Sequence, residues 1–479
     1  MKKDFSKYFA PSLRDARKRI HTDIKNIDFF IEDKYQGLGI NKTYMVKTYG
    51  CQGNIADSEK IVGIMDTLGF KEVFTEVEAD VIFFNTCAIR ENAENRIYGE
   101  LGRLKGLKTK NPNLLICLCG CMPQEEVTID LLRDKYTQVD IVFGTHNIHK
   151  IPEYLYDAYQ TNGRVLEVYS FEGEIIEGVP QKRTHKARAW VDIMYGCDEF
   201  CTYCIVPYTR GKERSRRPEN IINEVKELVS QGYLEVTLLG QNVNAYGKDF
   251  EDIKYTFGNL LEDLAKTNIK RIRYTTSHPR DLDDYTMEVM GKYSNIMPHL
   301  HLPVQSGSNQ VLKKMNRKYT REIYLEKINK LKTFVPSLSL TTDIIVGFPG
   351  ETEEDFNDTL KLVEEANFEG AYTFIYSPRK GTPAATYDNQ VPADVSKRRL
   401  LTLNKAINDG FLRGNKRFED AILEVFVEGT SDKDDNILTG YTEHNKLVNF
   451  EGSKDLIGTI QKVKITKAFT WHLRGELVK

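Results

Sequence analysis

Apolar runs alternate with amphipathic stretches along residues 42–160. Four runs have the length and composition of buried strands, and they span residues 44–49, 80–85, 114–118 and 139–143. Between them, residues 56–68 and 91–107 repeat apolar positions at helical spacing. Apolar strands that alternate with helices favour a doubly wound parallel sheet, so we expect an α/β domain here.

A second alternation of strands and helices runs through residues 189–410. The expected strands are 190–194, 236–239, 271–275, 299–302, 338–345 and 371–376. The expected helices include 220–231, 286–292, 321–334 and 353–366. About six such units predict an open, partial (βα)6 barrel, whose chemistry belongs at the C-terminal ends of the strands.

The last part of the chain changes to short β runs separated by polar turns. Residues 413–479 hold runs at 421–427, 437–441, 446–448, 457–465 and 470–476. Short strands of this number predict a small five-stranded β-barrel of the oligonucleotide-binding type. Lys462, Lys464 and Lys467 lie near Phe469 and Trp471. Basic residues among aromatic ones suit RNA, although an ordinary solvated strand face has the same pattern.

Two charged segments flank the first domain. Residues 1–41 form an N-terminal extension, which either packs on the body of the protein or reaches RNA as a basic arm. Residues 161–188 have the composition of an interdomain linker. This linker ends in a basic patch at residues 182–188, which is either solvated or in contact with phosphate.

The bulk composition is that of an ordinary globular protein. The 479 residues are 40% hydrophobic and 28% charged, with a formal net charge of −2. No apolar run reaches the roughly 18 residues of a transmembrane helix, and the N-terminus has no apolar signal-peptide region. We therefore expect a cytoplasmic protein without a membrane partner. The near-zero net charge excludes a global attraction to nucleic acid, which leaves local patches for any RNA contact.

Three cysteines follow the first three expected strands of the N-terminal domain. Cys51, Cys87 and Cys121 each come just past the end of a strand. Ligands gather at the carboxyl ends of strands in an open parallel sheet, so we expect these cysteines to converge and to hold an iron–sulfur cluster. Cys117 and Cys119 lie within the third strand on one face, and we interpret them as packing residues.

Three further cysteines lie in one loop after the strand at 190–194. Cys197, Cys201 and Cys204 have C-x3-C-x2-C spacing. Thiolates are the usual ligands of iron–sulfur clusters, and three of them leave one iron of a cubane open for an exchangeable ligand. A zinc site would need a fourth ligand, for which His185 is the nearby candidate, and a disulfide is disfavoured without a secretory signal.

This loop resembles the signature of radical S-adenosylmethionine enzymes, in which an aromatic residue, here Tyr203, precedes the last cysteine. The resemblance implies that S-adenosylmethionine binds the open iron. Polar or Gly-rich segments also follow the other barrel strands and outline one cofactor cleft. The candidate cofactor-binding residues are Tyr203, Gly240, Gln241, Asn242, Ser277, Gln305 and Asp343. Asp343 lies inside the fifth strand, where an unpaired carboxylate would be costly, and a polar cofactor partner accounts for it.

The order of the three domains resembles the methylthiotransferase family over about residues 42–478, with a TRAM-like RNA-binding barrel at the end. The matching motifs are at 48–54 with 57–59, at 85–91 and at 120–124. The runs 201–211 and 240–244 are most similar to the branch that acts on the isopentenyl-type adenosine of transfer RNA. Gly53 stands where the family commonly has Met, and the lead-in of residues 1–41 is longer than typical, but neither departure touches an expected ligand.

The resemblance implies methylthiolation at C2 of N6-dimethylallyl(isopentenyl)adenosine at position 37 of tRNA. S-adenosyl-L-methionine would serve both as methyl donor and as source of the 5′-deoxyadenosyl radical. Two [4Fe-4S] clusters would be held, one by Cys51, Cys87 and Cys121 and the other by Cys197, Cys201 and Cys204. No acid–base residue is assigned, because radical abstraction of hydrogen needs none. The target adenosine lies in the anticodon loop, where proteins can splay out single-stranded bases and read them.

The expected partners are tRNA and a low-potential electron donor such as flavodoxin or ferredoxin, and the chain is expected to be a monomer. The sulfur donor is not identified by the sequence. Two alternatives remain: methylthiolation of an aspartate in a ribosomal protein, and a non-catalytic iron–sulfur electron-transfer protein with an RNA-binding tail. The latter would use four cysteines for each cluster, whereas each group here has three.

Overall fold

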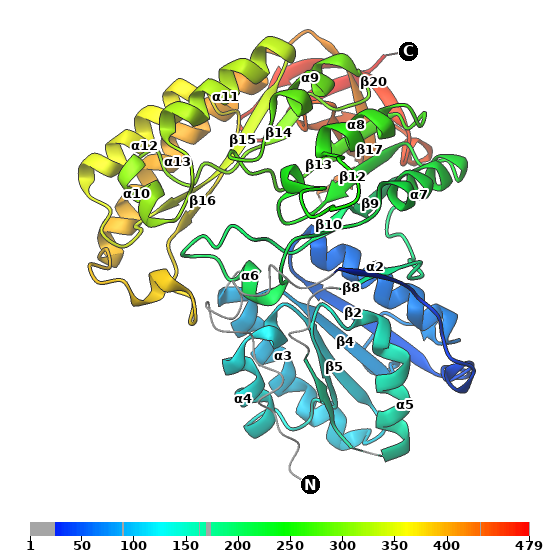
Figure 1. Ribbon diagram of the computed structural model, residues 1–479. Helices are drawn as coiled ribbons and strands as arrows, with labels where there is room; N and C mark the ends of the chain where they lie inside the picture. Colours follow the sequence, from blue (N-terminus) through cyan, green and yellow to red (C-terminus); the bar gives the residue numbers. More distant parts are fainter. Residues whose placement is uncertain (1–23, 89–90, 162, 169–173, 432, 479) are drawn as a thin grey trace. The chain divides into compact units, whose positions relative to one another are not determined.

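The computed structural model describes residues 24–88, 91–161, 163–168, 174–431 and 433–478 (Figure 1). Residues 1–23 of the expected N-terminal extension, which carry its basic stretch, lie outside this set. The chain divides into two compact units. The first holds the described residues up to Thr184 together with Tyr195–Asp198 and Ile205–Arg216. The second holds His185–Met194, Glu199–Cys204 and the described residues from Arg217 onward.

The first unit is built on a six-stranded parallel sheet in the order β3-β2-β4-β5-β6-β7. Its strands are β2 (Thr43–Tyr49), β3 (Lys71–Glu72), β4 (Val81–Thr86), β5 (Leu115–Gly120), β6 (Ile141–Phe143) and β7 (Val165–Glu167). Strands β4 and β5 are buried along their whole length, as expected when helices cover both faces of a parallel sheet. The predicted doubly wound sheet is confirmed, with β3 and β7 as additional edge strands.

Two hydrophobic cores lie on the two faces of this sheet. The helices of the unit are α2 (Gln52–Thr67), α3 (Glu91–Lys110), α4 (Glu126–Asp134), α5 (Ile151–Thr161) and the one-turn α6 (Val206–Thr209). Phe83 and Cys117 join the core beneath α2 and α5, whereas Phe84 and Leu118 join the core beneath α3 and α4. Figure 1 shows these two helix pairs on opposite sides of the sheet. The division follows from the two-residue period of side chains along a strand.

Shorter elements complete this part of the chain. They are β1 (Lys25–Asp28), β8 (Glu174–Glu177), β10 (Met194–Tyr195), β11 (Arg214–Ser215), η3 (Asp33–Tyr35), η4 (Met122–Gln124) and η5 (Ile148–Lys150). The segment expected to be a linker, 161–188, contains β7 and β8, and β8 pairs in parallel with β1. Lys182 and Arg183 of its basic patch form ion pairs with Glu72 and Glu59. Both cations therefore have carboxylate partners within the protein.

The second unit begins with two three-stranded parallel sheets, in the orders β13-β12-β9 and β14-β15-β16. The strands are β9 (Arg188–Asp192), β12 (Glu235–Leu239), β13 (Arg271–Tyr274), β14 (His299–His301), β15 (Ser339–Val346) and β16 (Ala371–Ile375). All pairs are parallel, and an isolated parallel bridge joins Ile272 and Ile296 beside the junction of the sheets. The order of strands is that of the predicted open barrel.

Helices cover the outside of this partial barrel (Figure 1). They are α7 (Pro218–Ser230), α8 (Phe257–Ala265), α9 (Asp284–Lys292), α10 (Asn309–Lys314), α11 (Arg321–Phe334), α12 (Glu353–Ala366) and α13 (Ala393–Lys416), with the short turns η6 (Val243–Ala245) and η7 (Pro383–Thr386). Four of them begin where the sequence supplies a capping side chain. Asp283, Ser308, Thr320 and Thr352 each accept a hydrogen bond from a first-turn amide.

The chain ends in a closed barrel with the strand order β17-β18-β19-β21-β20. Its elements are β17 (Ile422–Ser431), β18 (Asp434–Thr442), β19 (Leu447–Glu451), η8 (Lys454–Leu456), β20 (Ile460–Ala468) and β21 (Leu473–Leu477). Val425, Val427, Val463 and Ile465 are two apart on their strands and fill the interior. The predicted five-stranded barrel is confirmed.

Candidate functional site

The first candidate site lies at the carboxyl edge of the sheet in the first unit. Cys51 caps α2 just beyond β2, while Cys87 and Cys121 directly follow β4 and β5. The Cys87 amide donates to the Tyr49 carbonyl at 2.9 Å, and the Cys121 amide donates to the Thr86 carbonyl at 2.8 Å. Strands β2, β4 and β5 are neighbours, so these three residues, called here the strand-edge cysteines, follow one another along one edge.

Ionisation separates Cys51 from the buried cysteines, since burial raises the pKa of Cys121 as well as those of the two cysteines inside β5. A hydrogen bond with the Cys87 thiol is the largest influence that lowers the pKa of Cys51, to about 5, and the charge of Arg210 acts in the same direction. Burial raises the pKa of Cys117 and Cys119 well above the usual range of a thiol. Both side chains belong to the core beneath α2 and α5, which confirms that they are packing residues.

Backbone turns and amide side chains shape the strand edge. Gly120 has a φ of 96°, and a Cβ there would lie 2.3 Å from the carbonyl oxygen of Thr86, so only glycine fits. Asn54 Nδ2 donates to Asn85 Oδ1 at 3.1 Å, and Asn54 Oδ1 accepts from the Cys51 amide at 3.2 Å. Three thiols on adjacent strand ends, tied by a buried amide pair, fit a cluster bound through three thiolates.

The second group, called here the loop cysteines, consists of Cys197, Cys201 and Cys204. Cys197 belongs to the first unit, whereas Cys201 and Cys204 belong to the second. The preceding Gly196 has a φ of 78°, and a Cβ there would lie 1.9 Å from the Lys212 carbonyl oxygen. As at Gly120, a glycine directly before a cysteine allows a close backbone approach that no other residue permits.

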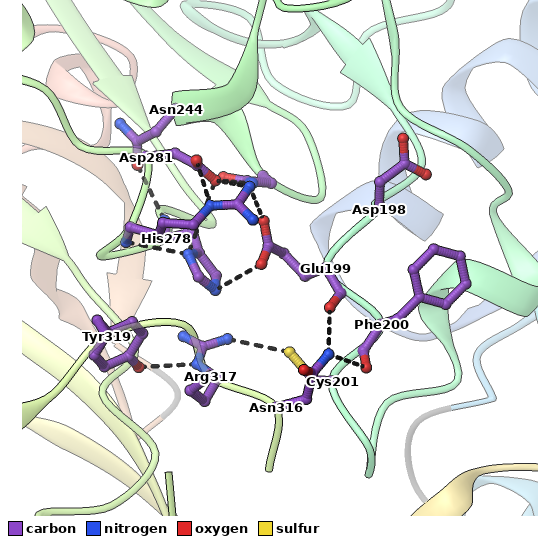
Figure 2. Close-up of polar contacts among 12 residues, drawn as sticks. Asp198, Glu199, Phe200, Cys201, Asn244, His278, Asp281, Asn316, Arg317 and Tyr319 are labelled. Carbon is purple, nitrogen blue, oxygen red and sulfur yellow. Dashed lines mark hydrogen bonds and ion pairs between the residues drawn. The ribbon is translucent and has the colours of Figure 1, made fainter. Parts of the chain in front are cut away.

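Asn316 and Arg317 hold the second-unit part of the loop (Figure 2). Asn316 Nδ2 donates to the carbonyl oxygens of Glu199 and Phe200 at 3.1 and 3.0 Å. Arg317 is buried, and its Nη1 donates to Cys201 Sγ at 3.4 Å. Phe200 has a φ of 46°, an uncommon conformation for a bulky residue. The sequence reasoning missed both supporting residues, because they lie far along the chain from the loop.

Glu199 belongs to a cluster of ion pairs (Figure 2). The Glu199 carboxylate contacts Arg280 and lies 3.6 Å from Nε2 of His278. Asp281 contacts Arg280 and Lys248. Burial lowers the pKa of His278 well below its usual range, so the imidazole is neutral. Glu199, His278 and Asp281 lie close enough together for a metal ion, but cations of the chain already pair with both carboxylates, so we interpret the cluster as an anchor for the loop.

Several candidate cofactor residues lie at the C-terminal ends of the barrel strands. Residues 240–242 follow β12, Ser277 follows β13 and Gln305 follows β14. Ser277 Oγ is buried without a hydrogen-bond partner in the described part of the chain, and Gln305 has a φ of 71°. An orphaned hydroxyl and a rare backbone conformation at the same edge fit a polar ligand. Asn242 Nδ2, by contrast, already donates to Asp281 Oδ2 at 2.7 Å.

Tyr203 and Asp343 both have protein partners. The ring of Tyr203 packs edge to face against Phe348, with centroids 6.5 Å apart. Asp343 Oδ1 lies 3.3 Å from Nε2 of His301. Asp343 thus has a partner within the protein, and its assignment to the cofactor stays a prediction.

The three lysines expected to contact RNA are exposed on β20. Lys462 pairs in register with Glu424 of β17, and Lys464 pairs in register with Glu476 of β21. Opposite charges across neighbouring strands offset one another, so this face is mixed rather than purely basic.

A hollow on the same barrel combines aromatic rings with a cation. Its volume is about 560 Å³, and Phe469, His472 and Arg474 line it together with Asn449, Glu451 and Glu476. The rings of Phe469 and His472 stack at 4.7 Å. Aromatic rings beside a cation and an amide match the groups that bind unstacked bases.

Three family descriptions match successive parts of the chain. Residues 43–144 match the "Uncharacterized protein family UPF0004", residues 191–363 match the "Radical SAM superfamily", and residues 416–478 match the "TRAM domain". None of the helices in the described part of the chain is long and apolar enough to cross a membrane.

Curated relatives match the chain from end to end. A Bacillus cytotoxicus protein named tRNA-2-methylthio-N(6)-dimethylallyladenosine synthase is 55% identical, over 100% of this chain and 95% of its own length. A Geobacillus kaustophilus protein of the same name is 54% identical, over 99% of this chain and 91% of its own. Among solved structures, the radical S-adenosylmethionine methyltransferase TsrM from Kitasatospora setae has a TM-score of 0.52 at 13% identity, covering 72% of this chain and 74% of TsrM. At that identity the likeness concerns the fold alone.

Proposed function

Because this chain belongs to the family of tRNA-2-methylthio-N(6)-dimethylallyladenosine synthases, we propose that it adds a methylthio group at C2 of N6-dimethylallyladenosine at position 37 of tRNA. The observation that carries this proposal is an identity of 55% over the whole chain, which includes both cysteine groups and the terminal barrel. The names of these relatives favour neither a ribosomal-protein substrate nor a non-catalytic role.

The cofactors are two [4Fe-4S] clusters and S-adenosyl-L-methionine. We assign one cluster to the strand-edge cysteines and the other to the loop cysteines. The support is that each group supplies three thiols, and that the chain holds Cys117 and Cys119 apart as buried core residues. When bound, these groups supply the methyl group and the 5′-deoxyadenosyl radical that the reaction needs.

The chain itself contributes positioning and binding. Arg317 donates to the sulfur of Cys201, and Asn316 fixes the carbonyl groups just before it. The buried hydroxyl of Ser277 and the backbone at Gln305 would bind the polar ends of S-adenosyl-L-methionine. Hydrogen bonds that fix the position of the loop and of the cofactor keep the reactive group aligned with its substrate.

The C-terminal barrel would contact the tRNA. We favour the hollow with Phe469, His472 and Arg474 over the strand face with Lys462 and Lys464, because the hollow places stacked rings beside a cation, although both surfaces contain glutamate. A base in the anticodon loop has to leave its stack before an enzyme can reach C2. Stacking surfaces on the barrel would hold neighbouring nucleotides of the loop during that step.

We further propose that the enzyme works in the cytoplasm, where its tRNA substrate is found, and acts as a monomer. Reduction of the loop cluster needs a low-potential electron donor, for which flavodoxin or ferredoxin is the expected type. The choice of electron donor rests on the chemistry of the reaction.

Analysis of tRNA nucleosides from a strain that lacks the gene tests the function. The expected result is loss of the 2-methylthio group with retention of the dimethylallyl group, and rescue by the wild-type gene but not by a Cys201→Ala variant. Unchanged tRNA nucleosides in the deletion strain would overturn the proposal. A change in a ribosomal protein together with unchanged tRNA would instead establish the alternative substrate.

A further inference from the structure

Arg210 follows the loop cysteines in the sequence, but it lies near the strand-edge cysteines in the structure. In the sequence it follows the loop cysteines and ends α6. In the structure it belongs to the first unit, together with the strand-edge cysteines. Its side chain is buried, and its Nη2 donates to Asp57 Oδ2 at 2.7 Å.

Gly53 shows how near the guanidinium lies to the sulfur of Cys51. A Cβ built on Gly53 would be 3.5 Å from Arg210 Nη2 and 3.6 Å from Cys51 Sγ. The two groups therefore border the same small space beside α2.

The same guanidinium reaches a second thiol, because Arg210 also donates a hydrogen bond to the side chain of Cys121. Its carboxylate partner Asp57 lies 2.7 Å away. Two charges of opposite sign thus lie beside one set of thiols.

We propose that Arg210 is a positioning residue of the strand-edge site, where its guanidinium, anchored by Asp57, stabilises the thiolates and raises the reduction potential of the cluster that they hold. This proposal rests on the proposed function, which assigns that cluster. A cation and an N–H donor near cluster sulfur both favour the more negative, reduced state, which is the direction proposed.

The experiment uses the full-length chain with Cys197, Cys201 and Cys204 all changed to Ala, so that only the strand-edge cluster remains. Arg210→Gln, Arg210→Lys and Asp57→Asn are added one at a time. Arg164→Gln is the matched control, because Arg164 is a partly buried cation of the same unit whose side chain bonds to the carbonyl oxygens of Val139 and Leu132. Midpoint potentials come from anaerobic redox titrations followed by electron paramagnetic resonance.

Opposite signs are expected for the two partners of the ion pair. Arg210→Gln lowers the potential and speeds iron loss to a chelator at least several-fold, Arg210→Lys gives a smaller change of the same sign, and Asp57→Asn raises the potential. Arg164→Gln leaves the potential unchanged. Equal potentials in all variants, or shifts of one sign for both Arg210→Gln and Asp57→Asn, would overturn the role of Arg210. Absence of any cluster in the parent triple variant would instead refute the ligand assignment in the proposed function.

Discussion

The two cysteine groups reach a similar donor set by different routes. The loop cysteines all lie within residues 197–204, whereas the strand-edge cysteines come from the ends of three separate strands. Glycine precedes a cysteine in both groups, at Gly120 and at Gly196, and each takes a positive φ in a crowded place. The backbone requirement is the same, although one site is local in sequence and the other is built by the sheet.

A buried arginine serves each group, and the partners of the two arginines differ. Arg317 donates to Cys201 and otherwise to the neutral oxygens of Pro303 and Tyr319. Arg210 is paired with the carboxylate of Asp57. Arg210 is therefore paired with a carboxylate at the strand edge, whereas Arg317 has neutral oxygens as its other partners at the loop. Since potentials of iron–sulfur clusters follow local charge, we expect the two clusters to differ in potential.

The largest effect expected is the loss of half the iron. Replacing all loop cysteines by Ala should reduce iron from about eight to about four atoms per chain, and replacing all strand-edge cysteines should do the same. Both triple variants should be inactive. Iron and sulfide analysis with Mössbauer spectroscopy under anaerobic conditions measures this. Four irons in wild type that fall to none without the loop cysteines would mean that the strand edge holds no cluster.

Single substitutions at the end of β5 distinguish a cluster ligand from a packing residue. Cys121→Ala should lose the strand-edge cluster, because two thiolates remain for it. Cys119→Ala should keep both clusters and reduce stability by about 1–2 kcal/mol, since it only leaves a small void in the core. Iron content and denaturant unfolding measure the two effects. Equal iron loss in the two variants would contradict the assignment.

Gly120→Ala should weaken only the strand-edge site. A positive φ costs a non-glycine residue about 1 kcal/mol, and the contact with the Thr86 carbonyl forces a backbone shift as well. We expect a loss of about 2–4 kcal/mol in unfolding free energy and partial loss of one cluster. The control is Gly102→Ala on α3, where a Cβ meets nothing within 4 Å and the helix gains about 0.5–1 kcal/mol. Thermal unfolding and iron analysis measure both variants. Equal stability and equal iron content in Gly120→Ala and Gly102→Ala would contradict the role of the turn at Gly120.

Arg317→Lys should change the electronic properties of the loop cluster without changing the iron content. Lysine keeps the charge but loses the fork that serves Cys201, Tyr319 and the Pro303 carbonyl at once, at a cost of about 1–3 kcal/mol. Both clusters should remain, with a lower potential for the loop cluster when it is measured without the strand-edge cysteines. A potential unchanged from the parent would mean that the hydrogen bond to Cys201 has no electronic role.

Much of the fold follows from local pattern. The strands expected at 80–85 and 371–376 correspond to β4 and β16, because short runs rich in apolar and β-branched residues between helices have few alternatives. Edge strand β7 was missed since it is short and lies in a Gly- and Glu-rich segment. The formation of a short edge strand depends on the strand that it pairs with, and the local sequence does not show which strand that is.

Short-range patterns were enough to predict the order of the domains, the C-x3-C-x2-C loop and the three cysteines that follow expected strands. The contacts of Arg210 with Asp57, of Arg317 with Cys201 and of Asp343 with His301 could not be predicted without the fold. These contacts join residues far apart in the chain. Their existence depends on strand order and packing, which bring charges together after the local elements have formed.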